Sequence, residues 1–156
     1  MAKGLSAESI TVAAAELIEQ YGRSGFSMRL LADTMGVKTA SLYNHIENMD
    51  TLLTEVCRYA LRMQEDGELR AIAGKTGREA VWALAWAYRR FAQQHRELYW
   101  LVMDTAAGEP RVLDDAAARF TEPLKQVLSG VKTRGILGEV QLGAVSYTHL
   151  RAHETG

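Results

Sequence analysis

Small, hydrogen-bonding side chains are concentrated in one short run of this chain, at residues 38–44. The run holds Lys38, Thr39, Ala40, Ser41, Tyr43 and Asn44. Hydroxyl and amide groups can exchange hydrogen bonds with base edges and phosphates, and a small apolar group such as alanine can contact a thymine methyl. Small side chains also allow close approach to another surface. The chemistry of this run is therefore suited to contact with a nucleic-acid duplex.

Two short helical patterns separated by a turn hold this run, in the stretch SMRLLADTMGVKTASLYNHI at residues 27–46. Ser27 is a favourable N-cap for the first helix, and Gly36 lies where a left-handed residue commonly ends one. Thr39 can cap a second helix, expected over residues 40–46. A helix, a turn and a second helix can present one helix to the major groove, which is roughly 12 Å wide.

Helical patterns continue on both sides of this unit. The expected helices cover residues 7–21, 49–65, 78–95, 97–104 and 110–128, the last one kinked or split at Pro123. Ser6 and Asn48 are the expected N-caps, and Phe26 is expected in the core. The first 109 residues contain no proline, and no Asn-Gly or Asp-Gly hairpin joins alternating strands. The sequence therefore predicts an all-α fold.

The composition limits the possible classes of protein. The 156 residues carry a formal charge of −1 and a single cysteine, Cys57, which excludes an intrachain disulfide and disfavours a cysteine-based zinc cluster. No apolar run reaches the roughly 18 residues of a membrane span, so we expect a cytoplasmic protein. Residues 22–46 carry Arg23, Arg29 and Lys38 against Asp33, hence three minus one, or +2. This small local charge indicates that two such heads act together on DNA.

The sequence resembles the TetR (tetracycline-repressor-like) family of bacterial regulators over residues 10–56. The resemblance lies in AAAELIEQYG, FSMRLLADTMGV and ASLYNHIENMDTLL. It implies a helix-turn-helix DNA-binding domain at residues 1–48, a connecting helix at 49–66 and a partial effector-binding and dimerisation domain at 78–143. It also implies a homodimeric, ligand-responsive repressor that binds a palindromic operator.

The resemblance implies DNA-contacting roles for particular residues. Ser27 matches a cap and phosphate contact, and Arg29 a position that reaches a base or phosphate. The tip of the recognition helix matches Thr39, Ala40 and Ser41, and the backbone-contacting aromatic and imidazole match Tyr43 and His45. Met49 departs from the family, which usually has a phosphate-binding lysine there. Other roles stay open: capping alone for Ser27, packing for Tyr43, a structural hydrogen bond for His45, and solvated surface charges for Arg29 and Lys38.

Bulky side chains follow residue 78 and allow two interpretations. They can form an ordinary core, or they can line a cavity for a small effector, as the resemblance implies. The candidate effector-pocket residues are Trp82, Trp86, Tyr99, Trp100, Met103 and Phe120. A ligand that favours one separation of the two heads would weaken DNA binding through its differential affinity for the two states.

The sequence does not favour an enzyme. Cys57 lies on a helical face suited to packing, and no glycine-rich phosphate loop occurs. His149 and His153 have helical i, i+4 spacing but lie in the atypical segment described next, so we expect no metal and no cofactor. The alternative to a regulator is a helical interaction protein with a helix-turn-helix head that does not bind DNA.

Residues 144–156 do not match the pattern of the preceding chain. The string VSYTHLRAHET can be encoded by a transposon end followed by an adaptor of the kind used in DNA library preparation. We therefore expect a non-native tail there, the alternative being a native polar tail. Under this interpretation the last two long helices of the family, which pair between subunits, are missing.

Overall fold

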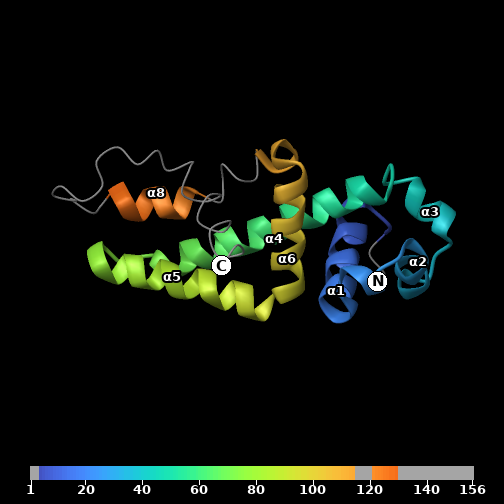
Figure 1. Ribbon diagram of the computed structural model, residues 1–156. Helices are drawn as coiled ribbons and strands as arrows, with labels where there is room; N and C mark the ends of the chain where they lie inside the picture. Colours follow the sequence, from blue (N-terminus) through green and yellow to red (C-terminus); the bar gives the residue numbers. More distant parts are fainter. Residues whose placement is uncertain (1–3, 115–120, 130–156) are drawn as a thin grey trace.

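The computed structural model describes residues 4–114 and 121–129, and every regular element among them is helical. The elements are α1 (Ala7–Gly25), α2 (Met28–Met35), α3 (Thr39–Tyr43), α4 (Met49–Ile72), α5 (Gly77–Gln94), α6 (Arg96–Gly108), the 3₁₀ turn η1 (Pro110–Leu113) and α8 (Glu122–Ser129). Figure 1 shows α1, α2 and α3 gathered at one end, which we call the head. The long helix α4 runs from the head into a body that α5, α6 and α8 build. The predicted all-α class is confirmed.

Side-chain caps begin α1, α2 and α4 as predicted. The Ser6 side chain accepts a hydrogen bond from the backbone of Ser9, whose side chain accepts one in return from the Ser6 backbone, forming a capping box. Ser27 Oγ accepts from the Leu30 N–H at 3.1 Å, and Asn48 Oδ1 accepts from the Thr51 N–H at 2.8 Å. Each cap satisfies a backbone donor that has no partner inside the helix. These short-range bonds fix where α1, α2 and α4 begin.

The turn between α2 and α3 is set by Gly36. Its backbone is left-handed, with φ 68°, and its N–H bonds to the Asp33 carbonyl at 3.2 Å. The Val37 N–H bonds to the Ala32 carbonyl at 3.0 Å, which completes a Schellman motif. Val37 also packs against the core as the apolar residue that follows such a motif. The predicted glycine C-cap is confirmed.

The bounds of α3 differ from the prediction. Lys38 rather than Thr39 occupies the N-cap, with no side-chain hydrogen bond, because its extended backbone lets the helix begin at Thr39. The helix ends at Tyr43 instead of residue 46. The N–H groups of His45 and Ile46 both bond to the Leu42 carbonyl, so a further turn follows the helix.

The connecting helix is longer than predicted. α4 continues through Gly67 to Ile72, past the expected end at residue 65, and the break comes at Gly74, whose φ is 71°. One glycine costs a helix only about 1 kcal/mol, and the buried face continues beyond it. The predicted break near His95 between α5 and α6 is confirmed. The predicted helix over 110–128 appears as η1 and α8, and residues 115–120 lie outside the described residues.

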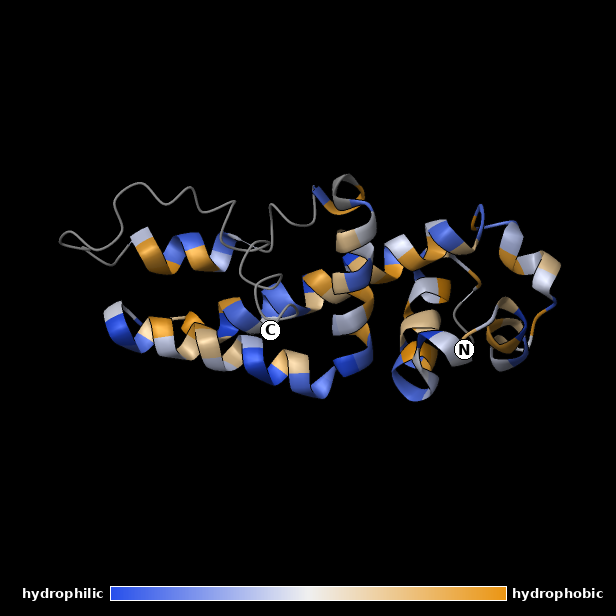
Figure 2. Cartoon of the chain, viewed as in Figure 1, coloured by the Kyte–Doolittle hydropathy of each residue, from blue (hydrophilic) through white to orange (hydrophobic). Residues whose placement is uncertain are grey.

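The apolar interior is continuous from the head into the near part of the body. One cluster of buried residues joins the helices from α1 to α6, and it includes Ile18, Leu42 and Leu98. A second, smaller cluster lies farther along the body around Ile72, Ala80 and Val127. Figure 2 shows apolar and polar bands alternating along the helices, as expected for helices that each bury one face.

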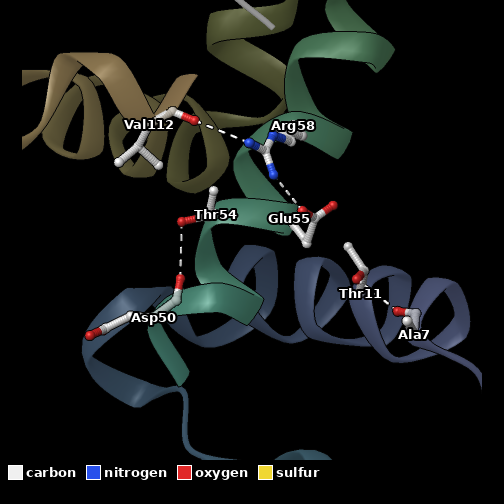
Figure 3. Close-up of polar contacts among 7 residues, drawn as sticks. All are labelled: Ala7, Thr11, Asp50, Thr54, Glu55, Arg58 and Val112. Atoms are coloured by element: carbon white, nitrogen blue, oxygen red, sulfur yellow. Dashed lines mark hydrogen bonds and ion pairs between the residues drawn. The ribbon is translucent and has the colours of Figure 1, made fainter. Parts of the chain in front are cut away.

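Polar contacts join α4 to η1 and to α6. Arg58 Nη1 lies 2.6 Å from Glu55 Oε1, and Nη2 donates to the Val112 carbonyl of η1 at 3.3 Å (Figure 3). Cys57 Sγ donates to Thr105 Oγ1 of α6 at 3.4 Å. Burial raises the pKa of the Cys57 thiol, which favours the packing role.

Candidate nucleic-acid interface

The tip of the head is formed by α3, which lies beside α2 at the end of the molecule (Figure 1). Leu42 is fully buried and anchors the helix to the main core. Its neighbours face outward: Ala40 and Asn44 are exposed, and Thr39 and Ser41 are partly exposed. A single buried anchor thus leaves the hydrogen-bonding residues accessible to a partner.

The start of α2 provides two further candidate contacts. The hydroxyl of Ser27 accepts the capping bond with its oxygen, which leaves its proton available to a phosphate. Arg29 lies on the exposed side, and its Nε is 3.9 Å from Asp33 Oδ2. An exposed pair at this distance contributes little, so the guanidinium can leave it for a stronger anion.

Cations and ring side chains complete this surface. Lys38 is exposed at the start of α3. Tyr43 is 47 % exposed, so packing accounts for only about half of its surface. His45 is exposed, and its ring makes no hydrogen bond within the part of the chain that the structure describes. The nine predicted contact residues are therefore all at least partly exposed on α2, α3 and the residues that flank these helices, and their contact with DNA stays a prediction.

The described candidates for the effector pocket are spread over α5 and α6, and they differ in exposure. Trp82 and Trp86 lie on an exposed face of α5, at 60 % and 54 % exposure, and the Arg89 guanidinium stacks 5.5 Å from the Trp86 ring centre. Trp100 is also exposed and touches Tyr99 edge-on. Met103 packs against the main core, and Phe120 lies outside the described residues. A pocket formed by these side chains stays a prediction.

A polar pair inside the body was not predicted from the sequence. Gln64 and Glu68 of α4 are 4 % and 3 % exposed, and Gln64 Nε2 donates to Glu68 Oε1 at 2.9 Å. The spacing 60, 64, 68 and 72 continues the buried face of α4 past the expected helix end. Two polar residues on an otherwise apolar face are the signal that could have located this pair.

Two models of known families match the chain. Residues 10–56 match the model described as bacterial regulatory proteins of the tetR family, which spans α1 to α3 and the first turns of α4. Residues 81–153 match a tetracyclin repressor-like C-terminal domain. The chain belongs to the TetR family. The second match reaches into the segment expected to be non-native, which lies outside the described residues, so the origin of that segment stays a prediction.

Relatives agree with the TetR family assignment. The chain is 33 % identical over 96 residues to YobS, an uncharacterized HTH-type transcriptional regulator of Bacillus subtilis, covering 62 % of this chain and 50 % of YobS. It is 31 % identical over 93 residues to the tetracycline repressor protein class D of Escherichia coli, covering 60 % of this chain and 42 % of that protein. The chain thus spans about half the length, or less, of these curated relatives.

Solved structures share the TetR-family fold. The regulator PfmR of Thermus thermophilus superposes with a TM-score of 0.63 at 22 % identity, covering 90 % of this chain and 80 % of that one. A protein of unknown function from a Rhodococcus species gives 0.73 at 22 % identity, covering 97 % and 80 %. None of the helices described for this chain is long and apolar enough to cross a bilayer.

Proposed function

We propose that this TetR-family chain is a transcriptional regulator whose α3 enters the major groove of operator DNA. The observation that supports this most strongly is the outward presentation of residues 38–45 around the buried anchor Leu42. The side chains on α3 would contact base edges, and Lys38, Tyr43 and His45 would contact phosphates. Ser27 and Arg29 would fix the position of the head from α2.

Two copies of the full-length protein would bind a near-palindromic operator, with their heads about one DNA turn apart. The low positive charge of one head makes this cooperation necessary, because each neutralised phosphate adds only one increment of affinity. A small effector bound in the body would favour an arrangement that fits DNA poorly and so relieve repression. Such a protein acts in the cytoplasm, contains no cofactor and catalyses no reaction.

A binding titration tests this proposal. The chain is titrated against labelled DNA from upstream of its own gene, over a range of salt concentrations, with fluorescence anisotropy as the readout. We expect saturable binding, with a binding constant whose logarithm falls linearly with the logarithm of the salt concentration. Lys38→Ala should weaken binding and reduce that slope by about one per head.

The matched control is Lys75→Ala, which removes the same charge from the exposed turn between α4 and α5, far from the head. Its affinity and slope should equal those of the wild type. Equal effects of the two variants would contradict the assigned interface. If no DNA from the region bound at any salt concentration, the alternative of an interaction protein with a silent head would be favoured.

A further inference from the structure

A layer of polar side chains separates the two apolar clusters of the body. The main cluster reaches along α4 to Leu61, and the smaller one begins at Leu69 and Ile72. Gln64 and Glu68 lie between these positions and are almost completely buried. An ordinary helical core would place apolar residues at both positions, so this layer costs stability that other interactions of the fold must offset.

The Glu68 carboxylate is poorly compensated in this layer. Within residues 4–114 and 121–129, Gln64 is its single hydrogen-bond partner, and no lysine, arginine or histidine is paired with it. A buried carboxylate usually accepts several hydrogen bonds or pairs with a cation. Desolvation raises the pKa of Glu68 to about 7, and the hydrogen bond from Gln64 offsets only part of that rise.

A pair of tyrosines from the two helices packed against α4 lies near this polar layer. Tyr88 of α5 and Tyr99 of α6 place their hydroxyl oxygens 3.2 Å apart and pack edge to face at 6.2 Å. Glu68 lies close enough to Tyr88 to contribute to raising the pKa of its hydroxyl, after burial and the contact with Tyr99. Tyr99 also packs edge-on against Trp100, at 5.7 Å. One acid from α4 and two tyrosines, from α5 and α6, thus lie near one another.

We propose that Glu68, supported by Gln64, Tyr88 and Tyr99, recognises an organic cation: the protonated amine of a small, largely apolar effector. A carboxylate attracts an ammonium group, and the electron-rich faces of aromatic rings favour the same charge. The flanking apolar clusters suit the rest of such a molecule. A metal ion fits less well, since the described residues contain no group of three acidic, histidine or cysteine ligands. The regulatory consequence, release of DNA, rests on the proposed function.

Calorimetric titration tests this assignment with two probes of similar shape. 4-Phenylbutylammonium carries the positive charge, and 4-phenylbutan-1-ol replaces it with a neutral hydroxyl. We expect wild-type protein to prefer the ammonium probe, and Glu68→Gln to weaken its binding roughly tenfold or more, because one member of a buried charge pair is lost. The alcohol should bind the wild type and this variant equally.

The control variant is Asp66→Asn, which removes an exposed carboxylate two positions away on the same helix and should leave both affinities unchanged. The proposal is overturned if Glu68→Gln binds the ammonium probe as tightly as the wild type does. It is also overturned if the wild type prefers the alcohol or binds neither probe. Thermal unfolding checks that Glu68→Gln folds cooperatively. If this variant does not fold, the preference of the wild type for the ammonium probe over the alcohol decides whether the proposal holds.

The result of the calorimetric test is separable from the test of the proposed function, because the calorimetric titration contains no DNA. If the chain binds DNA, the ammonium probe should lower the DNA affinity of the wild type and not that of Glu68→Gln. If the chain binds no DNA, the regulator assignment fails while the calorimetric preference for the cation still stands or falls by itself.

Discussion

At the scale of single residues, Glu68 lies in an environment that is unfavourable for a carboxylate. It is an acid buried between apolar clusters with one amide partner among the described residues. Its pKa is raised from 4.5 to about 7, chiefly by desolvation, with a smaller contribution from the neighbouring Glu65. Between about pH 4.5 and pH 7, Glu68 therefore holds a proton in the folded protein that it has released in the unfolded chain.

We predict a pH-dependent stability difference between the wild type and Glu68→Gln. Between about pH 4.5 and pH 7 the folded state binds more protons than the unfolded state, so the free energy of unfolding falls as the pH rises. This loss of unfolding free energy is complete above the pKa of Glu68 in the folded state and is on the order of 3 kcal/mol at most.

Urea denaturation at about pH 4 and at about pH 8 measures this effect. Other titrating groups cancel in the difference between the two proteins. Glu68→Gln should match the wild type at the lower pH and exceed its stability at the higher pH. A difference that does not change with pH would show that Glu68 titrates normally in the folded protein.

At the scale of elements, the end of α2 and the interior of α4 show how glycine has opposite effects in different settings. Gly36 ends α2 with φ 68°, a conformation that side-chain-bearing residues rarely adopt. Gly67 lies inside α4 with ordinary helical backbone and nothing within 4 Å of the position of a Cβ. The head depends on the first glycine, whereas the second only weakens a helix.

We predict changes of opposite sign for two glycine-to-alanine substitutions. Gly36→Ala should lower the free energy of unfolding by about 1–2 kcal/mol, because alanine must adopt a left-handed backbone. Gly67→Ala should raise it by up to about 1 kcal/mol, through better helix propensity and a less flexible unfolded chain. Denaturant titrations of both variants check this, and a stabilised Gly36→Ala would contradict the role of the turn.

The contact between head and body is a second feature at this scale. Oε1 of Glu19 in α1 lies 2.8 Å from Nδ1 of His95, the residue at which α5 ends and α6 begins. Three residues further along α1, a Cβ at Gly22 would lie 3.3 Å from Glu97 Oε2 of α6. The end of α1 therefore rests against the junction of two body helices, where a shift of the body would move the head.

We predict an energetic coupling between Glu19 and His95. In a double-mutant cycle with Glu19→Gln and His95→Phe, the coupling should be about 1 kcal/mol or less, since both side chains are partly exposed. The cycle is measured by thermal or urea unfolding. A matched cycle on Glu122 and Lys125, an exposed pair within α8, should give a smaller value. Additive effects of Glu19→Gln and His95→Phe would show that the contact does not tie head to body.

At the scale of the whole molecule, most local features could be predicted, apart from the two ends of α3, whereas distant contacts could not. Caps such as Ser6 and the turn at Gly36 depend on neighbours three to five residues away, so the sequence shows them directly. The end of α4 was misplaced because Gly67 is tolerated once the helix is packed on both sides. The contact of Glu19 with His95 joins residues 76 positions apart, and no periodic pattern announces it.

The exposure of the candidate interface residues was predictable for the same reason, while their contact with DNA stays a prediction. Its residues belong to one short helix and to the start of the helix before it, and the buried Leu42 sets which of them face outward. The proposed cation site depends instead on how α4, α5 and α6 meet. Aromatic composition suggested Trp82 and Trp86 for an effector pocket, which stays a prediction, and gave no indication of the buried pair Gln64 and Glu68.

The placement of α3 in the major groove is tested most directly by the DNA affinity of Ala40→Glu, measured by fluorescence anisotropy beside Ala85→Glu. Both alanines are exposed on helices, so each variant should fold, but only Ala40 lies at the tip of α3. A carboxylate there would face phosphates and base edges inside the groove, so we predict a loss of affinity on the order of a hundredfold. Ala85→Glu should bind as the wild type does. Wild-type affinity in a folded Ala40→Glu would contradict the placement of α3 in DNA.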